Sequence, residues 1–247
     1  MVIPKNTIYN ECCLVTMSRM ADKSIDTVIT SPPYNMGLRI RKGEYCKRTD
    51  ISFSKKYSSF SDDLFPDEYI DFHTKVLTEM LRVSKQIFYN IQVLTGNKLA
   101  VFKLIGRFAE NIKEIIVWDK RNGQPAMHPS VLNSQFELIL VLTDDRTDAR
   151  SRAFLNGNFQ RGTLGNIWRC SSRTNVTEGH SATFPSPWLS WSLITLRRKE
   201  TLSMTLLWGQ GQLRSHPSLR IAITSALKLY LSIMRSHSID WVAYNFH

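Results

Sequence analysis

The double proline at residues 32 and 33 constrains this chain more than any other feature. It follows the short apolar run Thr27 to Thr30 in the segment "SIDTVITSPPYN". Proline fixes φ and has no backbone N–H, so neither a helix nor a sheet ladder continues through two prolines. The segment therefore predicts a buried strand that ends abruptly and holds Ser31, Pro32, Pro33 and Tyr34 rigidly at its carboxyl end.

Helix and strand signals alternate along the chain after this point. Apolar residues have helical spacing over "PDEYIDFHTKVLTEMLRVS", and a second helix is expected near residues 97–109. The runs "QIFYNIQVL", "EIIVWDK" and "FELILVLT" predict buried strands. The alternation predicts an α/β fold with a parallel or mixed sheet and helices on its faces. Residues 38–62 and 144–180 are basic without an apolar period, which predicts surface loops.

Composition limits the function classes. A chain of 247 residues suits one domain, and its net charge of +11 favours a polyanionic partner. No apolar run is long enough for a membrane span, and no signal peptide is evident, so we expect a cytoplasmic protein without membrane contact. The four cysteines have neither C-x-x-C pairing nor histidines at ligand spacing, so we expect no metal site.

The segment Ser31-Pro32-Pro33-Tyr34 resembles the (S/D)-P-P-(Y/F) signature of DNA amino-methyltransferases. This family methylates the exocyclic amino nitrogen of cytosine or adenine with S-adenosylmethionine. The resemblance covers roughly residues 7–195, through "IYNECCLVTMSRMADKSIDTVITSPPYNMG", "IIVWDK" and "GHSATFPSP", in the motif order of the β class. It implies a Rossmann-like methyltransferase sheet with helices on both faces. It further implies a bacterial or phage-encoded enzyme of DNA methylation, with a restriction nuclease as a candidate partner in restriction–modification.

The family chemistry assigns roles to the motif. The amino nitrogen of a base is a poor nucleophile because its lone pair is delocalised into the ring. The Ser31 hydroxyl and the Pro32 carbonyl would accept hydrogen bonds from the amino group and stabilise its developing charge, while Pro33 keeps the turn rigid. The base must leave the double-stranded DNA by flipping, and Tyr34 would stack on it. Serine at the first position weakly favours N4 of cytosine as the target atom, with N6 of adenine as the alternative.

The resemblance also implies a set of cofactor-binding residues. Besides Ser31, it places Cys13 and the "GHSATFPSP" residues His180, Phe184 and Pro185 at the cofactor. The basic segments 38–56 and 144–173 would face DNA. One departure weakens this site, because Cys12 stands where the family usually has an acid near the cofactor adenine.

Beyond residue 196 the chain departs from the family. The resemblance predicts a segment like "EGDTVLDPFMGSGTT", a helix and then "NYIGIE", and none of these follows "FPSPW". Joining the last base of each codon to the first two of the next forces Asp from Met204-Thr205 and Gly from Trp208-Gly209. In that frame, residues 199–215 can encode the glycine-rich motif, and residues 222–228 can encode the second one. The G-x-G of residues 209–211 would then be accidental.

We therefore divide the chain into a catalytic region, residues 1–196, and an out-of-frame tail, residues 197–247. This division predicts a sheet that is incomplete at its cofactor-binding strands, and impaired binding of S-adenosylmethionine, although "TLSMTLLW" could imitate a buried strand. Two hypotheses stay open: an active DNA methyltransferase, and a catalytically silent remnant that only binds DNA. An RNA or protein amino-methyltransferase is less favoured, because such relatives usually carry N-P-P-Y.

Overall fold

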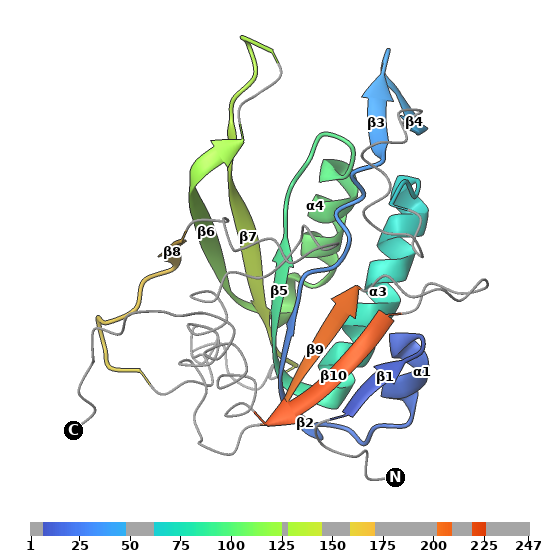
Figure 1. The fold of residues 1–247 in the computed structure, drawn as a ribbon, viewed down its shortest axis with the longest axis vertical. Helices are drawn as coiled ribbons and strands as arrows, with labels where there is room; N and C mark the ends of the chain where they lie inside the picture. The colour runs from blue at the N-terminus through green and yellow to red at the C-terminus, as the bar shows by residue number, and fades with distance from the viewer. Residues whose placement is uncertain are drawn as a thin grey trace.

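A computed structural model of the chain describes residues 7–47, 62–124, 128–144, 159–170, 202–208 and 219–225. Its main sheet contains β1 (Thr7–Asn10), β2 (Ile25–Thr30), β5 (Ser84–Ile91), β6 (Ile112–Gln124), β7 (Ser134–Leu142), β8 (Ile167–Arg169), β9 (Leu202–Trp208) and β10 (Leu219–Ser225). The strands lie in the order β1-β10-β9-β2-β5-β7-β6-β8 (Figure 1). The helices are α1 (Cys13–Ser18), α3 (Pro66–Val83), α4 (Lys98–Arg107) and the short 3₁₀ helix η1 (Ala109–Asn111). The mixed α/β sheet expected from the sequence is confirmed.

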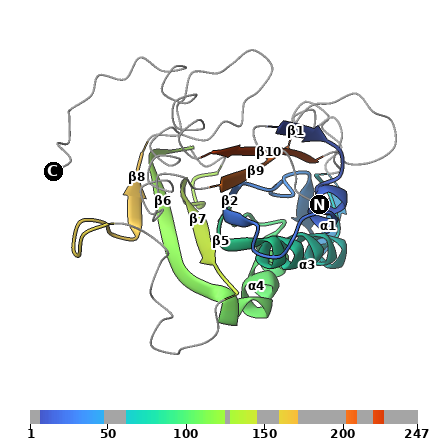
Figure 2. The ribbon, with the colours of Figure 1, turned by 90° about the horizontal axis from the view of Figure 1, so that it is seen from below.

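Strand β2 lies inside the sheet, parallel to both of its neighbours. Val28 pairs with Ile87 of β5 on one side and with Met204 of β9 on the other. Side chains alternate between the faces of a strand, so Val28 and Ile29 belong to two separate apolar clusters. The described helices α1, α3 and α4 cover the face that carries Val28 (Figure 2). The carboxyl end of β2 is thus held by a neighbouring strand on each side and by helices packed on one face of the sheet.

Helix α3 has sequence signals at both ends that explain its bounds. Pro66 is its first residue, and the Glu68 carboxylate accepts a hydrogen bond from the Phe65 N–H at 3.0 Å. In the last turn, the Arg82 guanidinium donates to the backbone carbonyls of Met17 at 2.7 Å and Met20 at 2.9 Å. Arg82 thereby ties the end of α1 to α3. Among the described residues, no helix is long and apolar enough to cross a membrane.

Two segments expected to be loops contain strands. Residues 38–47 form a separate antiparallel pair, β3 (Leu38–Arg41) and β4 (Glu44–Lys47). Its two-residue turn, Lys42-Gly43, has φ values of 52° and 86°, as a type I′ turn requires. Further along, β8 pairs in parallel with β6 through Trp118 and Trp168. The expectation of loops was wrong at these positions because cross-strand pairing, not apolar period, organises them.

The tail residues 202–225 contribute two strands to the sheet. Strand β9 occupies the position beside β2, so the apolar run "TLSMTLLW" does form a strand there, and Met204 is buried. The expectation that this run could imitate a buried strand is confirmed. However, β10 runs antiparallel to β9. The strand–helix–strand unit implied by the family resemblance would place a parallel strand after β9, and among the described strands the one that follows β9 is antiparallel to it.

Candidate active site

The four residues of the Ser31–Tyr34 segment follow β2 and are held by polar side chains from two other elements. The Tyr69 hydroxyl of α3 donates to the Pro33 carbonyl at 2.8 Å. The Asn97 amide, just before α4, donates to the Tyr34 carbonyl at 2.7 Å. Both Tyr69 and Asn97 are completely buried. Because these bonds form away from solvent and the prolines limit φ, the backbone of the segment is rigid.

Asn35 ends the segment in a left-handed conformation, with φ of 59°. Its side chain pairs with the backbone of Leu64 in both directions, donating to the carbonyl and accepting from the N–H at 2.7 Å each. Asparagine tolerates this region of φ better than other residues with a side chain. Asn35 therefore turns the chain away from the sheet and anchors it to the segment before α3.

The side chains of the segment join a chain of hydrogen bonds that crosses three strands. The Ser31 hydroxyl lies 2.7 Å from the Tyr34 hydroxyl, and Tyr34 donates to Glu137 Oε2 at 2.7 Å. The Asn90 amide of β5 donates to the Tyr34 hydroxyl at 2.6 Å and to Glu137 Oε2 at 2.7 Å. Lys120 of β6 binds Glu137 Oε1 at 2.6 Å. We call this set of residues the Ser31–Glu137 chain.

The ion pair at the end of the Ser31–Glu137 chain is largely buried, which strengthens the interactions between its charges. The side chains of Lys120 and Glu137 are only 13% and 7% exposed, and the Lys120 ammonium lies 5.6 Å from the centre of the Trp118 ring. A buried carboxylate needs such a partner, since an unpaired charge in the interior is costly. Asn90 is 1% exposed, and its Oδ1 has no hydrogen-bond partner among the described residues. The site therefore concentrates oriented polar groups beside the Ser31 hydroxyl.

The residues expected at the cofactor are not assembled into a site by the described part of the chain. His180, Phe184 and Pro185 lie outside the described residues. Cys13 is 2% exposed and packs in the core, and its contact with Cys12, together with burial, raises the pKa of its thiol. The thiol is therefore a poor nucleophile. Within the described residues, no group of His, Cys, Asp and Glu could hold a metal ion.

The neighbouring acid Glu11 is also engaged. Its carboxylate pairs with the Arg19 guanidinium and accepts from the Thr16 hydroxyl at 2.6 Å. Both partners belong to α1 or its end, so Glu11 stabilises this helix locally. Glu11 therefore does not replace the acid that the family resemblance places near the cofactor adenine.

Sequence reasoning identified the motif but missed the residues that orient it. Asn90 and Glu137 are polar residues inside the largely apolar runs "QIFYNIQVL" and "FELILVLT". A buried polar residue in a strand needs a hydrogen-bond partner, so a polar residue within an apolar run indicates a polar contact inside the fold. Which partner it meets depends on strand register, here the pairing of Asn90 with Ile139 and of Trp118 with Glu137.

Comparison with known proteins identifies the family of the chain. A family described as DNA methylase matches residues 25–191, a range that contains Ser31–Tyr34, Asn90, Lys120 and Glu137. No curated protein has a matching sequence.

Solved structures share the fold. The structure of PvuII DNA methyltransferase (cytosine-N4-specific) is 14% identical, with a TM-score of 0.55 over 79% of this chain and 71% of that one. A putative DNA modification methylase from Thermus thermophilus, in complex with S-adenosyl-L-methionine, is 12% identical, covers 78% and 77% of the two chains and has a TM-score of 0.46. The likeness to the first structure shows that the sheet has the architecture of such enzymes.

Proposed function

The chain belongs to the DNA methylase family, and from this premise we propose that it is a DNA amino-methyltransferase whose acceptor site is the Ser31 hydroxyl at the end of β2. The proposed substrate is a cytosine or adenine flipped out of double-stranded DNA, and the methyl donor is S-adenosylmethionine. The observation that carries this proposal is the rigid Ser31–Tyr34 segment joined to the buried Ser31–Glu137 chain. Serine at position 31 favours cytosine N4 as the target atom.

The arrangement suits activation of an amino group. As the nitrogen forms a new bond, positive charge develops on it and its N–H bonds become stronger donors. A hydroxyl oxygen and a backbone carbonyl held at fixed positions stabilise that charge without reorganising. Pro32 and Pro33 are buried, and Tyr69 anchors the Pro33 carbonyl, so the segment cannot retreat from the base. Tyr34, half-buried beside Ser31, supplies an aromatic ring for stacking.

The described residues do not by themselves form a complete site for the methyl donor. S-adenosylmethionine supplies the methyl group when it is bound. Strands β2, β5 and β9 are parallel, so their carboxyl ends share one edge, which is where ligands bind in open α/β sheets. The side chains do not complete a site, because the Cys13 thiol is buried and Glu11 is paired with Arg19. The described residues therefore do not fit the donor by themselves.

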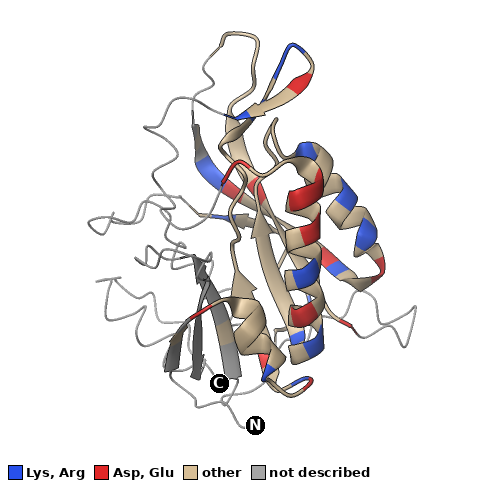
Figure 3. Cartoon of the chain, turned by 90° about the vertical axis from the view of Figure 1, so that its right-hand side faces the viewer, with Lys and Arg blue, Asp and Glu red and all other residues tan. Residues whose placement is uncertain are grey.

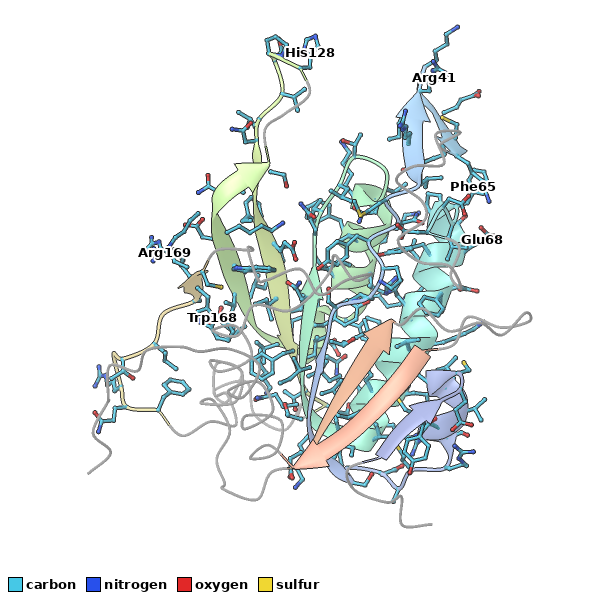
Figure 4. The ribbon with its side chains drawn as sticks, in the orientation of Figure 1. Arg41, Phe65, Glu68, His128, Trp168 and Arg169 are labelled. Atoms are coloured by element: carbon cyan, nitrogen blue, oxygen red, sulfur yellow. The ribbon has the colours of Figure 1, made fainter. Side chains whose placement is uncertain are left out.

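The proposed DNA contact uses the strand pair β3–β4. Arg39, Arg41 and Lys42 are exposed on this arm, and Figure 4 shows Arg41 at its outer end, with His128 at the outer end of β6 and β7. Both ends project beyond the same side of the sheet (Figure 1). Acidic and basic residues alternate on the outer face of α3 (Figure 3), so that face attracts phosphates less. A restriction nuclease remains the partner expected from the family.

The experiment that tests the proposed function measures transfer of a tritiated methyl group from S-adenosylmethionine to unmethylated plasmid DNA. Digestion of the product to nucleosides and mass spectrometry would distinguish N4-methylcytosine from N6-methyladenine. We expect Ser31→Ala to lower the transfer rate by about 100-fold, the magnitude typical of one oriented group at a developing charge. Ser24→Ala, in the loop before β2, is the matched control. Equal transfer by the Ser31→Ala variant would overturn the assignment.

A second candidate function is a silent remnant that binds DNA without methylating it. The antiparallel pairing of β10 with β9 favours it, because the family resemblance implies a parallel strand after the glycine-rich turn. Its cause would be a one-base shift near residues 196–200, which would separate the catalytic region 1–196 from the tail 197–247. The encoding nucleotides decide this directly: the alternative frame over residues 199–215 must spell the glycine-rich motif.

A further inference from the structure

The hydrogen-bond directions along the Ser31–Glu137 chain follow from the chemistry of its ends. An ionised carboxylate only accepts, and the amide nitrogen of Asn90 and the ammonium of Lys120 only donate. Glu137 forms an ion pair with Lys120, whose Nζ lies 2.6 Å from Oε1. Since Tyr34 lies 2.7 Å from Oε2, its single proton must point to Glu137.

The phenol oxygen of Tyr34 can then only accept further hydrogen bonds, through its lone pairs. Its two other polar neighbours are the Ser31 hydroxyl and the Asn90 amide. Asn90 Nδ2 occupies one lone pair at 2.6 Å. The Ser31 hydroxyl at 2.7 Å must donate to the other. Every hydrogen-bonding position of the Tyr34 hydroxyl is thus filled, with one bond donated and two accepted. The Ser31 proton is committed to Tyr34. Asn90 Nδ2 also lies 3.5 Å from Ser31 Oγ, a long contact that leaves Ser31 one further lone pair to accept a hydrogen bond from another donor.

We propose that Glu137, held by Lys120, is a positioning residue that orients the hydroxyls of Tyr34 and Ser31 so that Ser31 can only accept a hydrogen bond from the target amino group. The proposal rests on the proposed function. If Ser31 instead pointed its proton at the amino nitrogen, it would engage the lone pair that must form the new bond. Glu137 prevents this orientation from the far end of the chain, without touching the base.

Replacement of Glu137 by Gln gives a test at constant size. Lys120 attracts the amide oxygen, so the amide NH2 takes the place of Oε2. There it faces the Tyr34 hydroxyl and the Asn90 amide nitrogen and can no longer accept a hydrogen bond from either. Tyr34 then points its proton at Ser31, and Ser31 turns its own proton toward the target. Replacing one oxygen of Glu137 by nitrogen thus reverses the direction of both hydrogen bonds, at Tyr34 and at Ser31. We expect methyl transfer at saturating plasmid DNA to fall about 10- to 100-fold, with KM for DNA changed less than about twofold.

The same substitution in a Tyr34→Phe background separates orientation from structure. Phenylalanine keeps the ring but removes the hydroxyl that links Ser31 to Glu137. The link that is left runs through Asn90 Nδ2, which lies 2.7 Å from Glu137 Oε2 but 3.5 Å from Ser31 Oγ and is therefore the weaker one. We expect Glu137→Gln to have almost no further effect on the rate in that background, a strong non-additivity. Glu114→Gln, on β6 outside the chain, is the matched control. Equal losses in both backgrounds would show that Glu137 acts structurally and would overturn the proposal.

A second measurement does not depend on activity. With ¹³C at the phenolic carbon, each of the eight tyrosines gives one NMR signal, and Tyr34→Phe identifies the signal of Tyr34. We expect this signal to move with Glu137→Gln and to stay with Glu114→Gln. An unmoved signal would overturn the proposed orientation, whatever the methylation result. A moved signal in a chain that methylates no DNA would instead contradict the proposed function and leave the orientation established.

Discussion

At the scale of single residues, Asn35 combines a costly backbone conformation with two hydrogen bonds. Its φ of 59° is unfavourable for most residues, and its side chain satisfies both backbone groups of Leu64. We expect Asn35→Ala to lower the free energy of unfolding by about 3 kcal/mol, from two lost hydrogen bonds and about 1 kcal/mol of backbone strain. Urea denaturation measures this loss.

Asn35→Gly separates the two contributions. Glycine loses the same hydrogen bonds but adopts a positive φ freely, so this variant should be about 1 kcal/mol more stable than Asn35→Ala. If the two variants unfold at the same urea concentration, backbone conformation does not explain why asparagine occupies this position.

The motif residues could be predicted from the sequence, but their distant hydrogen-bond partner could not. Ser31, Pro32, Pro33 and Tyr34 were identifiable because two prolines after an apolar run have few structural explanations. Their position at the end of β2 is confirmed. Glu137 was out of reach, because it lies more than 100 residues from Tyr34 in the sequence and meets it only through the register of β5, β6 and β7.

At the scale of elements, the packing of α3 on β5 predicts a pH dependence of stability. His73 of α3 is fully buried against Tyr69 and Tyr89, and desolvation lowers its pKa from 6.5 to about 3. Between pH 6.5 and 3 the unfolded chain therefore binds a proton that the folded chain excludes. Stability from this group is present above pH 6.5 and is lost as the pH falls, by at most about 1.4 kcal/mol per pH unit.

His73→Leu removes this proton linkage. We expect the unfolding free energy of the variant to fall less steeply with acid than that of the original chain over this window, as measured by urea titrations at several pH values. His128→Gln, at an exposed tip, serves as the control. Parallel curves for the original chain and His73→Leu would mean that the buried imidazole is not the group responsible.

The β3–β4 arm gives a prediction about DNA binding. If Arg41 and Lys42 contact phosphates, replacing both with Ala should weaken binding to duplex DNA and make its salt dependence shallower by about 0.9 per lost contact. Fluorescence anisotropy across a salt series measures both effects. Lys75→Ala with Lys103→Ala removes the same charge from exposed positions on α3 and α4. An equal change in the two double variants would show a general effect of net charge instead of an arm contact.

Elements with a strong apolar period were predictable, and those formed by pairing alone were not. The period over residues 66–83 and the apolar runs of β5, β6 and β7 matched the structure. Strands β3, β4 and β8 were missed because they are short and have several exposed residues. The apolar run of β9 was recognisable in the sequence, but its pairing with β2 depends on the strand order of the whole sheet, which no local pattern of the tail describes.

At the scale of the whole molecule, the sheet consists of strands from the residues that match the family and of two strands from the tail. The matched residues 25–191 supply β2, β5, β6, β7 and β8 together with α3 and α4. The tail supplies β9 and β10, which lie between this core and β1. A run of apolar residues can complete a sheet by backbone pairing alone, whereas a cofactor site also needs specific side chains and a specific turn. Sheet completeness and cofactor binding are therefore separate properties in this chain.

This separation leads to a prediction about S-adenosylmethionine. We expect the chain as it stands to bind the cofactor at least about tenfold more weakly than a version whose residues from 199 onward are translated in the alternative frame, because that version regains the glycine-rich turn and the ribose-binding acid. Isothermal titration calorimetry measures both affinities, and Ser31→Ala in the restored chain controls for changes at the acceptor site. If the two chains bind equally, the tail with β9 and β10 already completes the pocket, the proposed frame shift has no functional consequence, and the active enzyme is the better description. If only the restored chain binds, the loss of this turn silences a methyltransferase whose acceptor site is still intact.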